Sequence, residues 1–137
     1  MIDRLPDWPA RLSELVTRAH ALPFAWGSHD CCLWAADAVV ALTGRDPAID
    51  LRGLYFDEFG AYRALRAVGG LLGAGQRTGR RLTNPRFALD GDVAIVSDGR
   101  LPMLAVRSAD VWLCAATQGL HALPIDAARI AWGVGHA

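Results

Sequence analysis

The fold of this chain is decided by residues 24–44, which read FAWGSHDCCLWAADAVVALTG. A turn with aromatic residues and glycine leads to Asp30, whose carboxylate can accept a hydrogen bond from a free amide at a helix start. Apolar residues then recur as far as Leu42, and Gly44 follows, a residue that commonly ends helices. The pattern predicts a buried helix that begins at Cys31.

Cys31 is predicted to lie in the first turn of this helix. Unpaired amides and the helix dipole favour a thiolate there, and such a setting can bring a cysteine pKa from about 8.5 to roughly 3.5–7.5. A nucleophilic cysteine is presented in this way. An ordinary buried cysteine on a helix that packs against a sheet has the same surroundings. Both interpretations are open at this point.

The length and composition indicate one domain over residues 1–137, large enough to bury about two thirds of its unfolded surface. Hydrophobic residues make up 53%, so either the core is generous or a partner covers part of the surface. The formal net charge is zero, which argues against nucleic acid or an anionic membrane as a partner.

Neither a membrane span nor a disulfide framework is indicated. No segment reaches the roughly 18 apolar residues that a spanning helix needs, and the first residues lack the pattern of a signal peptide. Three cysteines, two of them adjacent, do not form a disulfide framework. We therefore expect a protein made in the cytoplasm, without membrane insertion.

Helical spacing predicts one further helix before the central one and one after it. Asp7 is expected to cap the first, which runs to about Ala21. The third runs from Asp57 to Val68, with Tyr62 and Leu65 facing inward. Residues 71–87 are rich in Gly and Arg and predict a solvated loop.

Short strands dominate the rest of the chain, predicted at 93–96, 103–106, 111–115, 120–124 and 130–134, with a helical turn at 126–128. Helices followed by antiparallel strands are the α+β pattern. We expect the central helix to pack on this sheet through Trp26, Trp34 and Trp112.

Several short motifs resemble those of the NlpC-type cell-wall cysteine peptidases, whose fold is papain-like. Phe24 and Trp26-Gly27 precede Asp30-Cys31, and LDGDV at 89–93 precedes a strand. The combination of WGSHDCC at 26–32, GDV at 91–93 and AWGV at 131–134 more closely resembles a family of short proteins of unassigned function. That family occurs among the tail genes of tailed phages, prophages and gene-transfer particles.

The resemblance implies roles for individual residues. Cys31 matches the family nucleophile, Met103 stands where the partner histidine is expected, and Cys114 falls at the third polar position. A thioether cannot accept a proton near neutral pH, so the cysteine–base pair that acyl transfer requires is broken. We expect Met103 and Cys114 to close the former site as part of the core.

Other histidines are weaker alternatives for the base. His29 is expected to be a hydrogen-bonded turn residue that points away from the cysteine, and His121 could reach it only with a different sheet register. His136 lies in the C-terminal tail, where disorder is expected.

A metal site is also weighed, since His29, Cys31, Cys32 and Cys114 are ligand types for zinc or an iron–sulfur cluster. Adjacent cysteines on a helix point about 100° apart, whereas structural zinc sites space their cysteines by two or more residues. We therefore expect no metal and no cofactor.

The sequence thus predicts a papain-like α+β domain with a degenerate catalytic set, serving as a tail-tip or tail-assembly component of a phage-like particle. The partners implied are other tail or baseplate proteins, with peptidoglycan as a further one. The alternative is an active cysteine peptidase that cleaves peptidoglycan stem peptides during cell-wall penetration, with Cys31 as nucleophile.

Overall fold

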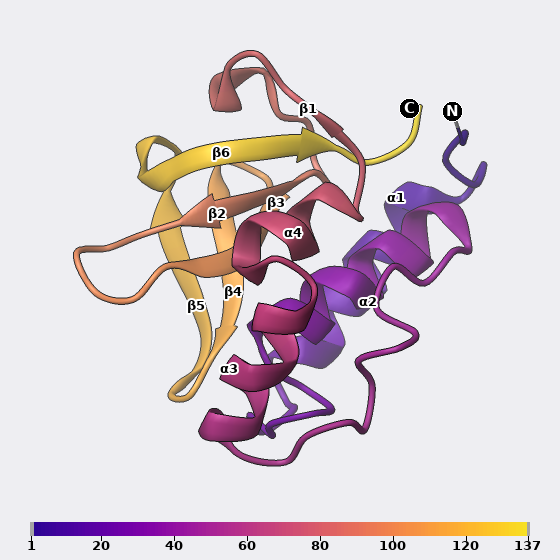
Figure 1. Ribbon diagram of the computed structural model, residues 1–137. Helices are drawn as coiled ribbons and strands as arrows, with labels where there is room; N and C mark the ends of the chain where they lie inside the picture. Colours follow the sequence, from indigo (N-terminus) through magenta and orange to yellow (C-terminus); the bar gives the residue numbers. More distant parts are fainter. Residues whose placement is uncertain (1, 137) are drawn as a thin grey trace.

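The computed structural model describes residues 2–136 and has a curved antiparallel sheet with helices packed on one face (Figure 1). The strand order is β1-β6-β2-β3-β4-β5, which confirms the predicted α+β class. The helices are α1 (Trp8–Ala19), α2 (Cys31–Thr43), α3 (Glu58–Ala67) and α4 (Gly70–Gln76). The strands are β1 (Arg80–Arg81), β2 (Val93–Val96), β3 (Met103–Ser108), β4 (Val111–Ala116), β5 (Gly119–Pro124) and β6 (Ala128–Gly133). Two short 3-10 turns, η1 (Pro85–Phe87) and η2 (Ile125–Ala127), precede β2 and β6.

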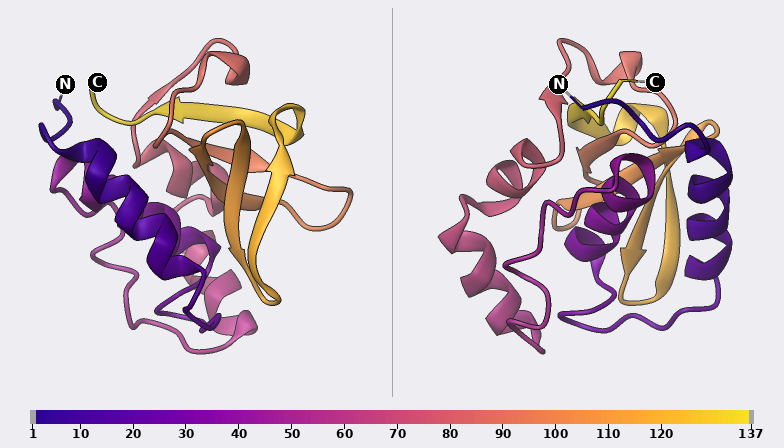
Figure 2. Two further views of the ribbon diagram at one scale, coloured as in Figure 1. Left: turned by 180° about the vertical axis from the view of Figure 1, so that it is seen from behind. Right: turned by 90° about the vertical axis from the view of Figure 1, so that its right-hand side faces the viewer.

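Helix α2 is the central element, as the sequence predicted. The Asp30 side chain accepts a hydrogen bond from the Leu33 amide at 3.0 Å, and Gly44 ends the helix with a φ of 79°, in the left-handed region that glycine adopts readily. Eight of its 13 residues are buried, so it is apolar around most of its circumference. Such a helix must be covered on several sides, and α1, α3, α4 and the sheet surround it (Figure 2).

The sheet separates two hydrophobic clusters because successive side chains alternate between its faces. Leu104 and Val106 pack with helices α1, α2 and α4 in the first cluster. Ala94, Ala105 and Cys114 belong to the second, on the opposite face, which contains no helical residue from α1–α4. The core is therefore thicker on the helical side.

The tryptophans divide between these clusters. Trp34 is buried in the first, as predicted. Trp112 is also buried, but it lies in the second cluster, where its indole N–H donates to the Ile125 carbonyl at 3.2 Å, so it does not pack α2 on the sheet. Trp26 is only half-buried. Strand alternation at 111–116 decides the position of Trp112.

The predicted inward position on α3 was wrong for Tyr62, whereas Leu65 packs against the first hydrophobic cluster. Tyr62 is 61% exposed, and Ala61 and Ala64 are buried in its place, with Leu65 half-buried. The helix lies so close to its neighbours that a Cβ on Gly60 would come within 2.9 Å of the Tyr55 Cβ. Only small side chains fit on that side, so the aromatic residue faces outward.

Two other local predictions need correction. Asp7 precedes α1, which ends at Ala19, but its carboxylate pairs with Arg11 at 2.8 Å and makes no capping hydrogen bond. The predicted loop at 71–87 contains α4 and β1. Glycine-rich α4 forms because it packs closely, since a Cβ on Gly75 would fall 2.2 Å from the Trp132 ring.

A buried network around the Arg4–Asp92 ion pair joins the N-terminal segment to the residues that follow β6. The Arg4 guanidinium donates to Asp92 at 2.8 Å, to the Val134 carbonyl at 2.8 Å and to the Asp90 carbonyl at 2.7 Å. Asp92 also accepts from the Val134 amide at 2.9 Å. The expected disorder of His136 was wrong, because its backbone pairs with the N-terminal segment.

Within residues 2–136, no helix combines the length and the apolar character that crossing a membrane requires.

Replacing Arg4 with alanine should lower the free energy of unfolding by about 3–5 kcal/mol, because it leaves a buried carboxylate without its counter-charge. The side chains of Arg4 and Asp92 are 1% and 5% exposed. The matched control is Arg11→Ala, which removes an ion pair whose side chains are 49% and 59% exposed and should cost less than about 1 kcal/mol. Urea unfolding of both variants measures the difference. Equal losses would contradict the structural role of Arg4.

Candidate functional site

The turn before α2 is built on the buried carboxylate of Asp30, which is 2% exposed. It accepts hydrogen bonds from the Gly27 amide at 3.0 Å, from the Leu33 amide at 3.0 Å and from the Tyr55 hydroxyl at 2.6 Å. Gly27 has a φ of 86°, and any Cβ there would collide with the Tyr55 carbonyl. The start of α2 is therefore held in one position.

Tyr55 was not identified in the sequence as part of this turn. It lies 25 residues beyond Asp30, in an irregular segment, and burial followed by its bond to Asp30 raises its pKa. A buried tyrosine needs a hydrogen-bond partner for its hydroxyl, but the sequence did not show that Tyr55 is buried or which residue is its partner.

Cys31 follows directly and is half-buried. A hydrogen bond from the Cys32 thiol, and after it one from the Leu104 amide of β3, lower the pKa of Cys31, while burial and the Asp30 charge act in the opposite direction. The same thiol–thiol bond, together with burial, raises the pKa of Cys32. Of the two neighbours, Cys31 is therefore the one that ionises first.

Cys114 lies close enough to Cys31 for the two to interact electrostatically. It is fully buried, and its thiol donates to the His121 carbonyl with the sulfur 3.6 Å from the oxygen. Burial, then Cys31, then Asp98 raise the pKa of Cys114 to about 12. This thiol stays protonated at neutral pH and cannot serve as a base.

Met103 is half-buried and packs in the second hydrophobic cluster together with Cys114, whereas Cys31 packs against the first. Of the two residues expected to close the former site, Cys114 is fully buried, whereas Met103 is half-buried and lies on the face of the sheet opposite Leu104. The reason is strand alternation: Leu104 faces the helices and offers its amide to Cys31, so its neighbour Met103 faces the other way.

The histidines lie elsewhere. The backbone of His29 is paired with Ala25, and its imidazole acts on the pKa of Asp37, farther along α2. His121 is 49% exposed on β5, with its Nε2 3.8 Å from an Asp98 carboxylate oxygen. Within residues 2–136, the groups that shift the Cys31 pKa include no imidazole.

The candidate metal ligands are not brought together. In the described part of the chain, no group of three or more His, Cys, Asp or Glu side chains is placed to hold a metal ion.

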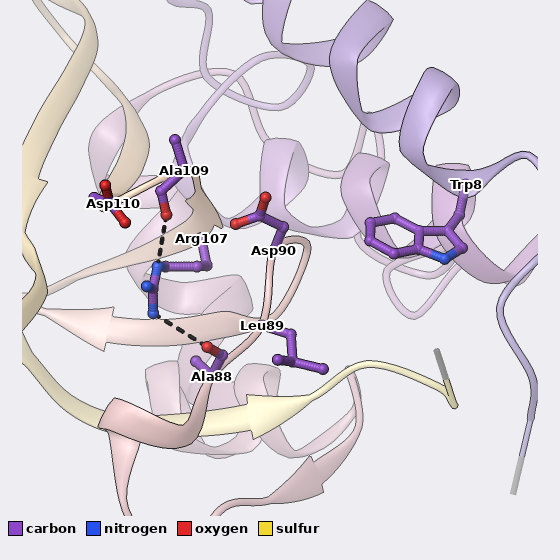
Figure 3. Close-up of a pocket in the computed structure, with 7 residues that line it drawn as sticks. All are labelled: Trp8, Ala88, Leu89, Asp90, Arg107, Ala109 and Asp110. Carbon is purple, nitrogen blue, oxygen red and sulfur yellow. Dashed lines mark hydrogen bonds between the residues drawn. The ribbon is translucent and has the colours of Figure 1, made fainter.

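A cavity of about 450 Å³ lies away from Cys31, between α1 and the β3–β4 turn (Figure 3). Arg107 lines it, and its guanidinium is held by the carbonyls of Ala109 at 3.0 Å and Ala88 at 3.1 Å. Trp8 forms the opposite wall, with Asp90 between them. The volume of this cavity is therefore not available to a substrate of Cys31.

The comparisons with known proteins place most of the chain in one family. A family model described as "Domain of unknown function (DUF6950)" matches residues 3–134. No curated protein gives a significant match. The matched range includes Arg4, the turn at Asp30 and Val134, so it spans the residues that hold the two ends of the chain together.

The pH dependence of Cys31 alkylation should move when its neighbour is removed. Because the Cys32 thiol is the largest cause of the lowered Cys31 pKa, Cys32→Ala should raise that pKa and shift the inflection of the iodoacetamide rate to higher pH. At a fixed pH near 7 the variant should therefore be labelled more slowly than the parent.

The control for this experiment is Cys114→Ala, which leaves the hydrogen bonds from Cys32 and Leu104 to Cys31 in place. Mass spectrometry assigns the labelled residue, and Cys114 should stay unlabelled until the protein unfolds, because it is buried. An inflection that Cys32→Ala leaves unchanged would show that the thiol–thiol bond does not set the Cys31 pKa.

Proposed function

Since the chain belongs to the DUF6950 family of domains of unknown function, we propose from its own geometry that it is a degenerate NlpC-like domain with a papain-like fold. In this proposal it serves as a structural component of the tail tip or tail assembly of a phage-like particle. One observation carries the loss of catalysis: Cys31 is presented at a helix start beside β3, and the base position on that strand holds Met103.

The placement of three residues supports the papain-like assignment. The nucleophile position, Cys31, interacts with the strand of the base position through the Leu104 amide, next to Met103. It also interacts with Cys114, the third position, on the adjacent strand β4. The start of α2 thus lies beside β3 and interacts with a residue of β4, which supports the assignment, although the Met103 side chain itself faces the second hydrophobic cluster.

The chemistry of these residues favours a structural role. Acyl transfer by a cysteine needs a base or acid that moves a proton to the leaving amine. Met103 has no ionisable group, and the Cys114 thiol holds its proton with a pKa of about 12. The two positions that would move protons in a peptidase therefore cannot do so here.

Exposed apolar surface supports assembly with other proteins. Within residues 2–136, eleven large hydrophobic residues are exposed, among them Leu101 at 75%, Ile49 at 77% and Phe56 at 87%. Surface of this kind marks protein interfaces when it is contiguous. We propose other tail or baseplate proteins as the partners, with the domain made in the bacterial cytoplasm and carried in the particle.

A second candidate function is an active cysteine peptidase that cleaves peptidoglycan stem peptides. The lowered pKa and the remaining accessibility of Cys31 favour it. In that reaction the Cys31 thiolate attacks the amide carbonyl, the amine leaves with a proton, and water then hydrolyses the thioester. A residue other than Met103 would have to supply that proton.

Cys31→Ala separates the two candidates. In the structural role, the purified protein releases no fragments from peptidoglycan, and particles that carry Cys31→Ala assemble and penetrate the cell wall as the parent does. The matched control is Ser28→Ala, an exposed change in the same turn. Hydrolysis by the parent that is lost in Cys31→Ala, with assembly intact, would establish the peptidase instead.

Met103→His tests the papain-like arrangement itself. Residue 103 faces the second cluster, so it can act as the base position only by turning toward Cys31; the new imidazolium would then stabilise the Cys31 thiolate and move its alkylation inflection to lower pH. No hydrolysis is expected, because Cys114 still occupies the third position. Leu101→His, two residues away in the exposed turn, is the control and should leave the inflection unchanged. Identical inflections in both variants would contradict the assignment of Met103.

A further inference from the structure

The outer face of α3 carries the large side chains that the inner face cannot hold. Phe59 is 69% exposed and Tyr62 is 61% exposed, whereas the inward residues are alanines. The guanidinium of Arg63 lies over the Phe59 ring at 5.8 Å, and that of Arg66 lies over the Tyr62 ring at 5.9 Å. We call these four residues the α3 face.

Two further exposed apolar residues stand just before α3 in the chain. Leu54 is 63% exposed and Phe56 is 87% exposed. Aromatic residues and arginine are the types enriched at the centres of protein interfaces. The helix lies at the edge of the molecule remote from both termini, so neither end of the chain covers it (Figures 1 and 2).

Charges of opposite sign lie at the two ends of this helix. Asp57 and Glu58 are exposed at its N-terminal end, and Arg63 and Arg66 are exposed toward its C-terminal end. None of the four forms a salt bridge with another residue in the range 2–136. The face is therefore apolar in the middle, acidic at one end and basic at the other.

This distribution is self-complementary. In a two-fold interface the same patch is used twice, so residue i meets residue j of the second copy and j meets i. With the axis at Tyr62, Glu58 and Arg66 both lie four residues, or about 6 Å, from it in opposite directions. An antiparallel pair of α3 helices therefore sets Glu58 of each copy opposite Arg66 of the other.

A shallow hollow of about 330 Å³ on the same surface fits this pairing. It is lined by Arg63, Arg66 and Ala67, at the C-terminal end of α3. In the antiparallel arrangement this end faces the N-terminal end of the second helix, where Phe59 projects. The aromatic side chain of one copy thus has a place to enter on the other.

We propose that the protein forms a two-fold symmetric homodimer through antiparallel pairing of its α3 faces. At their observed exposures, Phe56, Phe59 and Tyr62 together offer on the order of 400 Å² of surface per protomer for burial in the interface. Leu54 and the two arginines bring the patch toward the roughly 800 Å² per partner of a standard interface. Because interfaces of this size vary widely in affinity, we place the expected Kd at the weak end of that range, at roughly 1–100 μM. The dimer does not depend on the function proposed above.

Sedimentation velocity of the full chain from roughly 1 to 500 μM should show a monomer–dimer equilibrium with that Kd. Phe59→Ser should weaken it at least about 30-fold, because a central aromatic is lost twice by symmetry. Leu101→Ser, an equally exposed apolar residue on the β2–β3 turn, is the control and should leave the Kd unchanged. A parent that stays monomeric throughout, or a dimer that Phe59→Ser leaves intact, would overturn the proposal.

Charge reversal distinguishes this arrangement from any other use of the same patch. Glu58→Arg or Arg66→Glu alone should weaken the dimer roughly fivefold to tenfold, and the double variant should recover most of that loss. Oxidised Tyr62→Cys should give a disulfide between the two copies at residue 62, identified by mass spectrometry, whereas Leu101→Cys should not. Failure of the double variant to recover, or no cross-link at residue 62, would exclude the antiparallel pairing.

Discussion

The buried carboxylate of Asp30 is the constraint on which the arrangement of this domain depends. Its three hydrogen bonds come from the turn before α2, from the first turn of α2 and from Tyr55 in a distant segment. A carboxylate buried with this many donors stays where it is, because losing any of them would leave a charge poorly solvated. Helix α2 therefore starts at one place, and Cys31 is positioned beside β3.

A second buried carboxylate, that of Asp92, pairs with Arg4 and ties the N-terminal segment to the rest of the domain. This pair joins the N-terminal segment, the entry to β2 and the residues after β6 in one buried network. The Asp-Cys and Gly-Asp motifs, which suggested chemistry in the sequence, thus both supply a structural aspartate. Their presence is explained by folding alone, so they are not by themselves evidence for catalysis.

Chemistry and assembly make different demands on the same scaffold. Cys31 keeps a lowered pKa through the thiol of its neighbour Cys32 and, after it, the Leu104 amide of β3. A peptidase additionally needs a residue that transfers a proton, and the neighbouring positions hold a thioether and a buried thiol. The exposed residues of the α3 face have no role in peptidase chemistry. The proposed association between copies accounts for them instead.

The sequence by itself determined α2, its cap at Asp30, its end at Gly44 and the α+β class, because capping and periodicity are local properties. It also located β2 to β6 to within a few residues, since alternation marks each strand. Only the tertiary structure decided the outward turn of Tyr62, the helical state of glycine-rich α4 and the partners of Asp30 and Arg4. Each of these depends on a contact between residues that local sequence preference does not predict. Close packing against Tyr55 explains the outward turn of Tyr62, and close packing against Trp132 explains the helical state of α4.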